Sequence, residues 1–309
     1  MTFGIHAKGI YPIAATPFTP DMAIDWDSLD RLTDFYEAAG ATGLTILGIM
    51  GEAQKLEPDE SLEVARRVIR RAKVPVVVGV SSPSFPAMRR LARDSMEMGA
   101  AGVMIAGTPA LRSDEQIAAY FRNAVEAIGA DVPWVLQDYP LMLSVVLSVP
   151  VIRAIMEEHP SCVMLKAEDW PQLDKLSAIR DLQKAGQLRP FSILTANGGL
   201  FLDFEPERGS DGAMTGYAFP DALVEIDALH RAGRRDEAHD LFDAHLPLIR
   251  YEAQPNVGLA ARKYLLMRRG AIASDTLRKP GAKLTATSRA EIEYLLGRVA
   301  RTDARAALR

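Results

Sequence analysis

One lysine of this 309-residue chain stands where it could act as a nucleophile. Lys166 directly follows the apolar run 162–165, and acidic residues come soon after it. A short continuous apolar run is typical of a strand buried on both faces, and loss of solvent at its end favours a neutral amine over an ammonium. A neutral amine can attack a carbonyl carbon and form an imine. The alternative interpretation is that Lys166 only marks the hydrated end of a strand.

The acidic residues after this lysine are the first candidates for proton transfer. Residues two apart in a strand share a face, so Glu168 is expected on the same side as Lys166. A carboxylate there could move protons or hold the ammonium as an ion pair. Alternatively, Glu168 and Asp169 cap a helix that starts near Pro171.

Three further segments could contribute to the same site. Gln137 and Tyr139 share a face at the end of another apolar run, where Tyr139 either offers a phenol or simply packs. The loops 48–51 and 197–199 contain glycines and could present backbone N–H groups to an anion. Each of these signals is weak alone, but a carboxylate substrate beside Lys166 would use them together.

The remaining composition excludes several classes of function. The single cysteine, Cys162, lies in an apolar run and is expected to pack in the core, so no internal disulfide or multi-cysteine metal site is predicted. The histidines lie away from the predicted strand ends, which argues against a catalytic metal. A net charge of −4 without a long basic run argues against nucleic acid as a partner. No signal peptide or membrane-spanning run is evident, and a cytoplasmic location is expected.

The elements that must position these residues alternate between strand and helix. Eight short apolar runs alternate with segments that show helical periodicity or a capping signal. The predicted strands are 10–16, 43–48, 74–80, 102–106, 134–137, 161–166, 191–196 and 212–215. Three helices without strands follow, at 236–249, 256–269 and 288–300, the last with a capping box from Ser288 to Glu291.

Eight strand–helix units predict an α/β fold, a TIM (β/α)8 barrel with a C-terminal three-helix extension. The competing architecture is an open, doubly wound sheet, but the first strand–helix turn has no glycine-rich phosphate fingerprint. The predicted division is a barrel domain over residues 1–233 and a helical extension over 234–309. In such barrels the active site lies at the carboxyl ends of the strands, where Lys166 is the only lysine.

Taken in order, several segments resemble the pyruvate-type Schiff-base aldolases, the dihydrodipicolinate synthase and N-acetylneuraminate lyase family. The segments that carry the resemblance are 11–18, 24–29, 48–52, 163–166, 212–215 and 278–280. The resemblance implies that Lys166 forms the imine and that Ile49, Met50, Gln137 and Met214 contact the substrate. It also implies no cofactor and a homo-oligomer, a dimer or a tetramer built from dimers.

The chain departs from the family pattern at three places. The family's loop reads Gly-Thr-Thr-Gly-Glu, whereas Ile49 and Met50 replace the two hydroxyl residues here. Gln137 stands where the family has a tyrosine that assists proton transfer, and a glutamine cannot act as an acid or base near neutral pH. The tyrosine that the synthases extend across a subunit interface is also absent near Thr108 and Pro109. The chain therefore looks like a divergent member.

Two functions are consistent with these residues. The first is a lyase, an aldolase or dehydratase, that acts on a 2-oxo acid such as pyruvate or a 2-keto-3-deoxy sugar acid. In this enzyme Tyr139, Glu168 or a water held by Gln137 would move the proton, and Ile49 and Met50 predict a less polar pocket. The second is a non-catalytic or degenerate 2-oxo-acid-binding protein on the same barrel.

Overall fold

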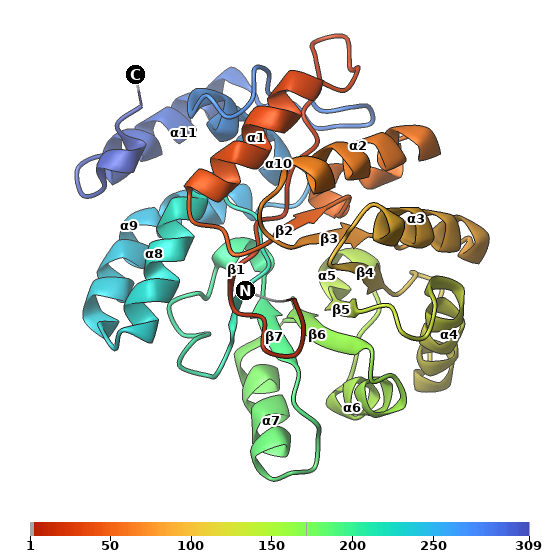
Figure 1. Cartoon of the computed structure of the whole chain (residues 1–309). Helices are drawn as coiled ribbons and strands as arrows, with labels where there is room; N and C mark the ends of the chain where they lie inside the picture. The colour runs from red at the N-terminus through yellow and green to blue at the C-terminus, as the bar shows by residue number, and fades with distance from the viewer. Residues whose placement is uncertain (1–2, 171, 309) are drawn as a thin grey trace.

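Eight parallel strands occupy the centre of the molecule and helices surround them (Figure 1). The computed structural model describes residues 3–170 and 172–308. The strands are ordered β1-β8-β7-β6-β5-β4-β3-β2, every pair is parallel, and a bridge between Ile13 and Thr45 joins the two ends of the sheet. The predicted barrel is confirmed, and the open doubly wound sheet is excluded.

The predicted strands all occur, with ends that shift by a few residues. Their bounds are β1 Gly9–Ile10, β2 Leu44–Ile46, β3 Val76–Gly79, β4 Gly102–Ala106, β5 Trp134–Asp138, β6 Cys162–Ala167, β7 Ser192–Thr195 and β8 Gly212–Ala213. The first differs most, because Pro12 has no N–H to continue the ladder. The chain beyond it still bonds to both neighbours, since the N–H of Ile13 donates to Thr215 (2.9 Å) and that of Ala14 donates to Thr45 (2.8 Å).

The helices form the outer ring (Figure 1). Their bounds are α1 Trp26–Ala38, α2 Pro58–Arg71, α3 Phe85–Glu97, α4 Asp114–Ile128, α6 Val149–Glu158, α7 Gln172–Lys184 and α8 Pro220–Arg231. A short helix that was not predicted, α5 Pro140–Leu143, follows β5. Pro171, near which the helix after the sixth strand was expected to start, lies outside the described residues.

The starts of two helices depart from the capping-box pattern. Ser113 does cap α4, but the Gln116 side chain accepts from the N–H of Arg112 (2.8 Å) rather than from that of Ser113. The last helix begins earlier than predicted, because Thr285 accepts from the N–H of Ser288 (3.0 Å) and so becomes its N-cap.

The strands separate two hydrophobic clusters. One fills the barrel interior with side chains from the strands and their ends, among them Val77, Met104, Val135, Met164, Leu194 and Met214. The larger cluster lies between the strands and the helices. Phe3 and Ala7 pack against the interior cluster, so the N-terminal segment closes the amino end of the barrel (Figure 1). The opposite end, where the strands finish, stays open for chemistry.

The three predicted C-terminal helices are also present. They are α9 Arg235–Glu252, α10 Gly258–Arg268 and α11 Ala286–Val299. α9 packs on α8 and contacts both α10 and α11, and its Phe242 and Leu248 belong to the larger cluster. The predicted boundary after residue 233 falls between α8 and α9 and stays a prediction.

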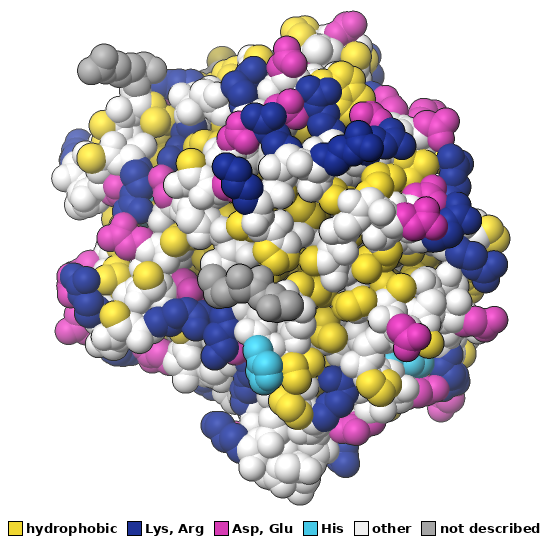
Figure 2. Space-filling view, viewed as in Figure 1, with side chains coloured by type: hydrophobic (Ala, Val, Ile, Leu, Met, Phe, Trp, Pro, Cys, Tyr) yellow, Lys and Arg dark blue, Asp and Glu magenta, His cyan; other side chains and the backbone are white. Residues whose placement is uncertain are grey.

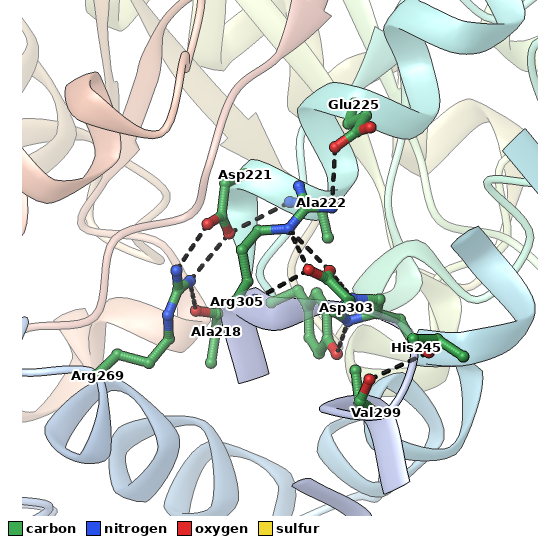
Figure 3. Close-up of polar contacts among 11 residues, drawn as sticks. Ala218, Asp221, Ala222, Glu225, His245, Arg269, Val299, Asp303 and Arg305 are labelled. Atoms are coloured by element: carbon green, nitrogen blue, oxygen red, sulfur yellow. Dashed lines mark hydrogen bonds and ion pairs between the residues drawn. The ribbon is translucent and has the colours of Figure 1, made fainter. Parts of the chain in front are cut away.

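A buried chain of polar contacts ties the C-terminal segment to the barrel (Figure 3). Burial lowers the pKa of His245, and its neutral ring accepts from the Tyr217 hydroxyl (2.8 Å) and donates to Asp303 (2.7 Å). Burial opposes the ionisation of Asp303, but hydrogen bonds from Arg305 and His245 more than offset this and lower the pKa of Asp303 to about 2. Arg305 also pairs with Glu225 on α8 (2.8 Å).

We expect Asp303→Asn to lower the free energy of unfolding by about 2 kcal/mol at pH 7, the size of a hydrogen bond to a charged group. Because the pKa of Asp303 is depressed in the folded state, its contribution is present above the ordinary value of 3.8 and is lost as the pH falls to about 2. Urea unfolding should therefore show a gap between variant and wild type that closes below pH 4. Glu225→Gln, a change at the exposed end of the same chain of contacts, is the control and should cost little.

One face of the molecule carries charges of both signs (Figure 2). On the face closed by the N-terminal segment, Lys and Arg are interspersed with Asp and Glu, without a large area of one sign (Figure 2). Of the helices in the described ranges, none is long and apolar enough to cross a membrane.

Candidate active site

Lys166 lies at the carboxyl end of β6 and faces the barrel axis. Its register partners are Gln137 on β5 and Leu194 on β7. Met164, two residues earlier, packs in the barrel interior, and the strand period places the lysine side chain on the same side. The lysine is 4% exposed, so its amine is withdrawn from bulk water but opens on a cavity.

A carboxylate and an amide complete a buried polar group around this amine. Glu168 Oε1 lies 2.7 Å from Lys166 Nζ and also accepts a 2.7 Å hydrogen bond from Gln137 Nε2. All three side chains are buried. Of the two interpretations open from the sequence, the ion pair with Lys166 is the one that the structure shows for Glu168. The amide of Gln137 orients the carboxylate on which the amine depends.

The residues next in sequence to Gln137 and Glu168 hold a different lysine. Lys175 Nζ lies 2.5 Å from Asp138 and 2.8 Å from Asp169. Burial raises the pKa of Asp138 to about 6, although the charge of Lys175 opposes the rise. This second cluster connects the ends of β5 and β6 to α7, and so positions Gln137 and Glu168 toward the cavity.

Tyr139 also lines the cavity, at the residue before α5. Burial, followed by the negative charge of Glu168, raises the pKa of Tyr139 to about 12. The phenol therefore keeps its proton at neutral pH and can donate a hydrogen bond to a ligand. It is a weaker acid than an exposed tyrosine, which limits it as a proton donor.

The loop after β2 brings Ile49 and Met50 to the cavity as a single 3-10 turn. The turn is fixed from below, because the Thr16 hydroxyl donates to the carbonyl of Gly51 (2.6 Å). The next residue, Glu52, is buried and accepts hydrogen bonds from Lys263 and Lys55, which also holds the turn in place. Burial lowers the pKa of Lys263 to about 8, and the charge of Glu52 opposes the change.

Asn197 enters the site from the loop after β7 and was named only as part of a glycine-containing loop. Its side chain donates to the Glu168 carbonyl (3.2 Å) and to the side chain of Gln172 (3.0 Å). Gln172 in turn donates to the buried carboxyl of Glu205 (2.7 Å), which also contacts Thr195. This network holds the backbone that carries Glu168, and no local sequence signal marked Gln172 or Glu205 as part of it.

The network makes stability depend on pH through Glu205. Burial raises the pKa of Glu205 to about 8 from an ordinary value of 4.5, so the folded protein prefers the protonated carboxyl. The stability from this preference is complete below pH 4.5 and is lost as the pH rises to about 8, at about 1.4 kcal/mol per pH unit.

We expect Glu205→Gln to remove most of this loss, because an amide stays neutral while it accepts from Gln172 and donates to Thr195. The variant should gain about 3 kcal/mol over wild type by pH 7, measured by urea unfolding at pH 5, 6, 7 and 8. The exposed Glu207→Gln is the control and should show no such gain. Parallel pH profiles for Glu205→Gln and wild type would contradict the assignment.

One cavity of about 1060 Å³ lies at the carboxyl ends of the strands. Six of the seven predicted site residues line it, namely Ile49, Met50, Gln137, Tyr139, Lys166 and Glu168. The seventh, Met214, is buried in the barrel interior beneath the cavity, and its contact with substrate stays a prediction. Apolar side chains are exposed at the cavity wall, at Leu141, Met142, Val146 and Trp170.

The residues available for metal binding are few. Over residues 3–170 and 172–308, no group of three or more His, Cys, Asp or Glu side chains is arranged to hold a metal ion.

Two further polar residues of the cavity wall, Glu252 and Arg262, come from the C-terminal helices and were not predicted as site residues. Nothing in the local pattern of α9 and α10 distinguishes them from structural charges.

Comparison with known proteins agrees with this geometry. The model of the dihydrodipicolinate synthetase family matches residues 6–298. The chain is 30% identical over 291 residues to L-2-keto-3-deoxyarabonate dehydratase of Azospirillum brasilense, covering 92% of both chains. It is 30% identical over 251 residues to 4-hydroxy-tetrahydrodipicolinate synthase of Pelobacter propionicus, covering 78% of this chain and 81% of that protein.

A solved structure is more similar still. The crystal structure of dihydrodipicolinate synthase from Rhodopseudomonas palustris is 62% identical to this chain and superposes with a TM-score of 0.95. The match covers 96% of this chain and 99% of the other.

Proposed function

The chain belongs to the dihydrodipicolinate synthetase family, and from this membership we propose that it is a class I lyase in which Lys166 forms an imine with a 2-oxo acid. The observation that supports this role most directly is the 2.7 Å contact between the buried Lys166 amine and Glu168. Attack requires the unprotonated amine, and a carboxylate at this distance can take the ammonium proton in one step.

The proposed reaction is a sequence of bonds that form and break at and next to the imine carbon. The amine adds to the C2 carbonyl and a water leaves, which gives an iminium on Lys166. The iminium accepts the electron pair released when the C3 proton is removed, or when the C3–C4 bond breaks to give an aldehyde. In a dehydration the C4 hydroxyl leaves as water. Hydrolysis of the imine returns the amine and the 2-oxo acid product.

Glu168 is the proposed proton-transfer group for these steps. Its carboxylate lies beside the nucleophile, and Gln137 holds it in place of the family's tyrosine. Tyr139 is proposed to hydrogen-bond the substrate rather than to exchange protons, since its pKa is about 12. Substrate contacts from Ile49, Met50 and Met214 complete the proposed site.

The size of the cavity supports a substrate larger than pyruvate. A volume of about 1060 Å³ is at the upper end for small-molecule sites, whereas pyruvate has only six non-hydrogen atoms. A 2-keto-3-deoxy sugar acid, such as the substrate that names the Azospirillum relative, or an aldol product of pyruvate would use this space. The apolar Ile49 and Met50 give that space a less polar wall than two hydroxyl residues would.

Reductive trapping tests the proposal. Incubation with pyruvate and borohydride should add a stable mass to Lys166, located by peptide mapping, and a panel of 2-keto-3-deoxy sugar acids should be cleaved or dehydrated. No adduct at Lys166 with any 2-oxo acid would refute the imine role. Adducts without turnover would instead support a degenerate 2-oxo-acid-binding protein.

We propose three further properties of the protein. A homo-oligomer is supported by the exposed apolar side chains at Leu141, Val146 and Trp170, which a second copy could cover. The division into a barrel and an extension after residue 233 is supported by the loop between α8 and α9, in which this boundary falls. A cytoplasmic location is supported by the single, buried cysteine.

A further inference from the structure

A buried arginine from the C-terminal helices reaches the wall of the cavity. Arg262 lies on α10 and is 2% exposed. Its Nε donates to Glu252 Oε2 (2.8 Å) and its Nη2 donates to the carbonyl of Gly216 (2.5 Å). These two contacts fix the plane of the guanidinium and leave Nη1 as its remaining nitrogen.

The guanidinium occupies the place that a side chain would take in the loop after β8. Met214 packs inside the barrel just after β8, and Gly216, two residues later, lines the cavity above it. Position 216 is a glycine, and a Cβ built there would lie 1.8 Å from Arg262 Nη1. The absence of a side chain at Gly216 therefore lets Arg262 lie above the barrel interior, where Lys166 also ends.

Nη1 has no acceptor among the described residues. A buried donor without a partner is costly, and a ligand is one way in which it can be satisfied. Arg262, Gly216 and Lys166 line the same cavity. The charge of Arg262 also acts on Tyr139, where it opposes the rise in pKa, so the cation is within electrostatic reach of the phenol.

We propose that Arg262 is a specificity-determining residue that binds a carboxylate of the substrate through Nη1. This inference rests on the proposed imine chemistry of Lys166. A guanidinium held in a fixed plane is well suited to a carboxylate, and Ile49 and Met50 at the cavity have no side-chain hydroxyl that could bind one. The carboxylate is either the one next to the reacting carbonyl or one at the far end of a 2-oxo diacid.

Two variants test Arg262 without leaving a cavity or an unpaired Glu252 behind. Arg262→Lys keeps a cation for Glu252 but has no second nitrogen to present. Gly216→Ala keeps both charges but places a methyl group where Nη1 lies. In both, the 2-oxo acid concentration that half-saturates borohydride trapping at Lys166 should rise by about 10-fold to 100-fold, as expected for loss of a hydrogen bond to a charged group.

Three probes locate the carboxylate. Pyruvate and 2-oxopentanoate have only the carboxylate next to the carbonyl, and 2-oxoglutarate has a second one at its far end. If the half-saturating concentration rises for all three probes, Arg262 binds the first carboxylate. If it rises for 2-oxoglutarate alone, Arg262 binds the second. Half-saturation that stays at the wild-type value for all three probes in both variants would overturn the inference.

The control is a neighbouring arginine of the same segment. Arg269 pairs with Asp221 and does not line the cavity, so Arg269→Lys should leave all three values unchanged. Thermal unfolding of every variant verifies that the fold is intact. If wild-type protein gives no adduct with any probe, the proposed function fails and this inference with it. If adducts form and half-saturation is unchanged in the Arg262→Lys and Gly216→Ala variants, only this inference fails.

Discussion

Lys166→Arg is expected to abolish the borohydride-trapped adduct and to lower turnover by about 10⁴-fold or more, as removal of a covalent nucleophile does. Arginine keeps the positive charge beside Glu168, so the buried ion pair survives in a similar form. A guanidinium does not lose its proton in proteins and cannot form the imine. The loss would therefore report on nucleophilicity and not on charge.

The matched control is another lysine near the strand ends. Lys175 is also largely buried and paired with two carboxylates, Asp138 and Asp169, but it does not line the cavity. Lys175→Arg should retain the adduct at Lys166 with full stoichiometry. Intact-protein mass spectrometry after trapping measures both variants, and an adduct that persists in Lys166→Arg would disprove the assignment of the nucleophile.

Glu168→Gln is expected to lower turnover by about 10²-fold to 10⁴-fold, the contribution of a well-placed acid–base group. Glutamine has the same shape and can still accept from Lys166 and Gln137 through its carbonyl oxygen. It cannot take a proton from the ammonium or from C3 of the imine. Trapping should therefore remain detectable but slow, while exchange of the pyruvate methyl protons with deuterium, followed by NMR, should fall with turnover.

Tyr139→Phe separates the two candidates for proton transfer. Because the Tyr139 phenol has a pKa of about 12, it keeps its proton at neutral pH, and loss of the hydroxyl should weaken substrate binding more than proton exchange. The opposite result would assign proton transfer to Tyr139, namely wild-type exchange in Glu168→Gln and lost exchange in Tyr139→Phe.

The fold was accessible from the sequence because its signals are local. Each strand is a short apolar run and each helix has its own periodicity or cap, so eight units could be counted without knowledge of their contacts. The errors lie where one hydrogen bond decides, as at Pro12, where a missing N–H shortens β1, or at Thr285, which takes the capping role expected of Ser288. Short α5 carries too few residues to show a period.

The chain alone also determined the central feature of the site, a lysine at a strand end with a carboxylate two residues later, because strand parity fixes their shared direction. Only the tertiary structure decided what surrounds them. Gln137 meets Glu168 through the register between β5 and β6, and Arg262 reaches the cavity because α10 packs over a glycine of β8's loop. Such contacts join residues far apart in the chain, and they depend on strand register and helix packing, which no local pattern specifies.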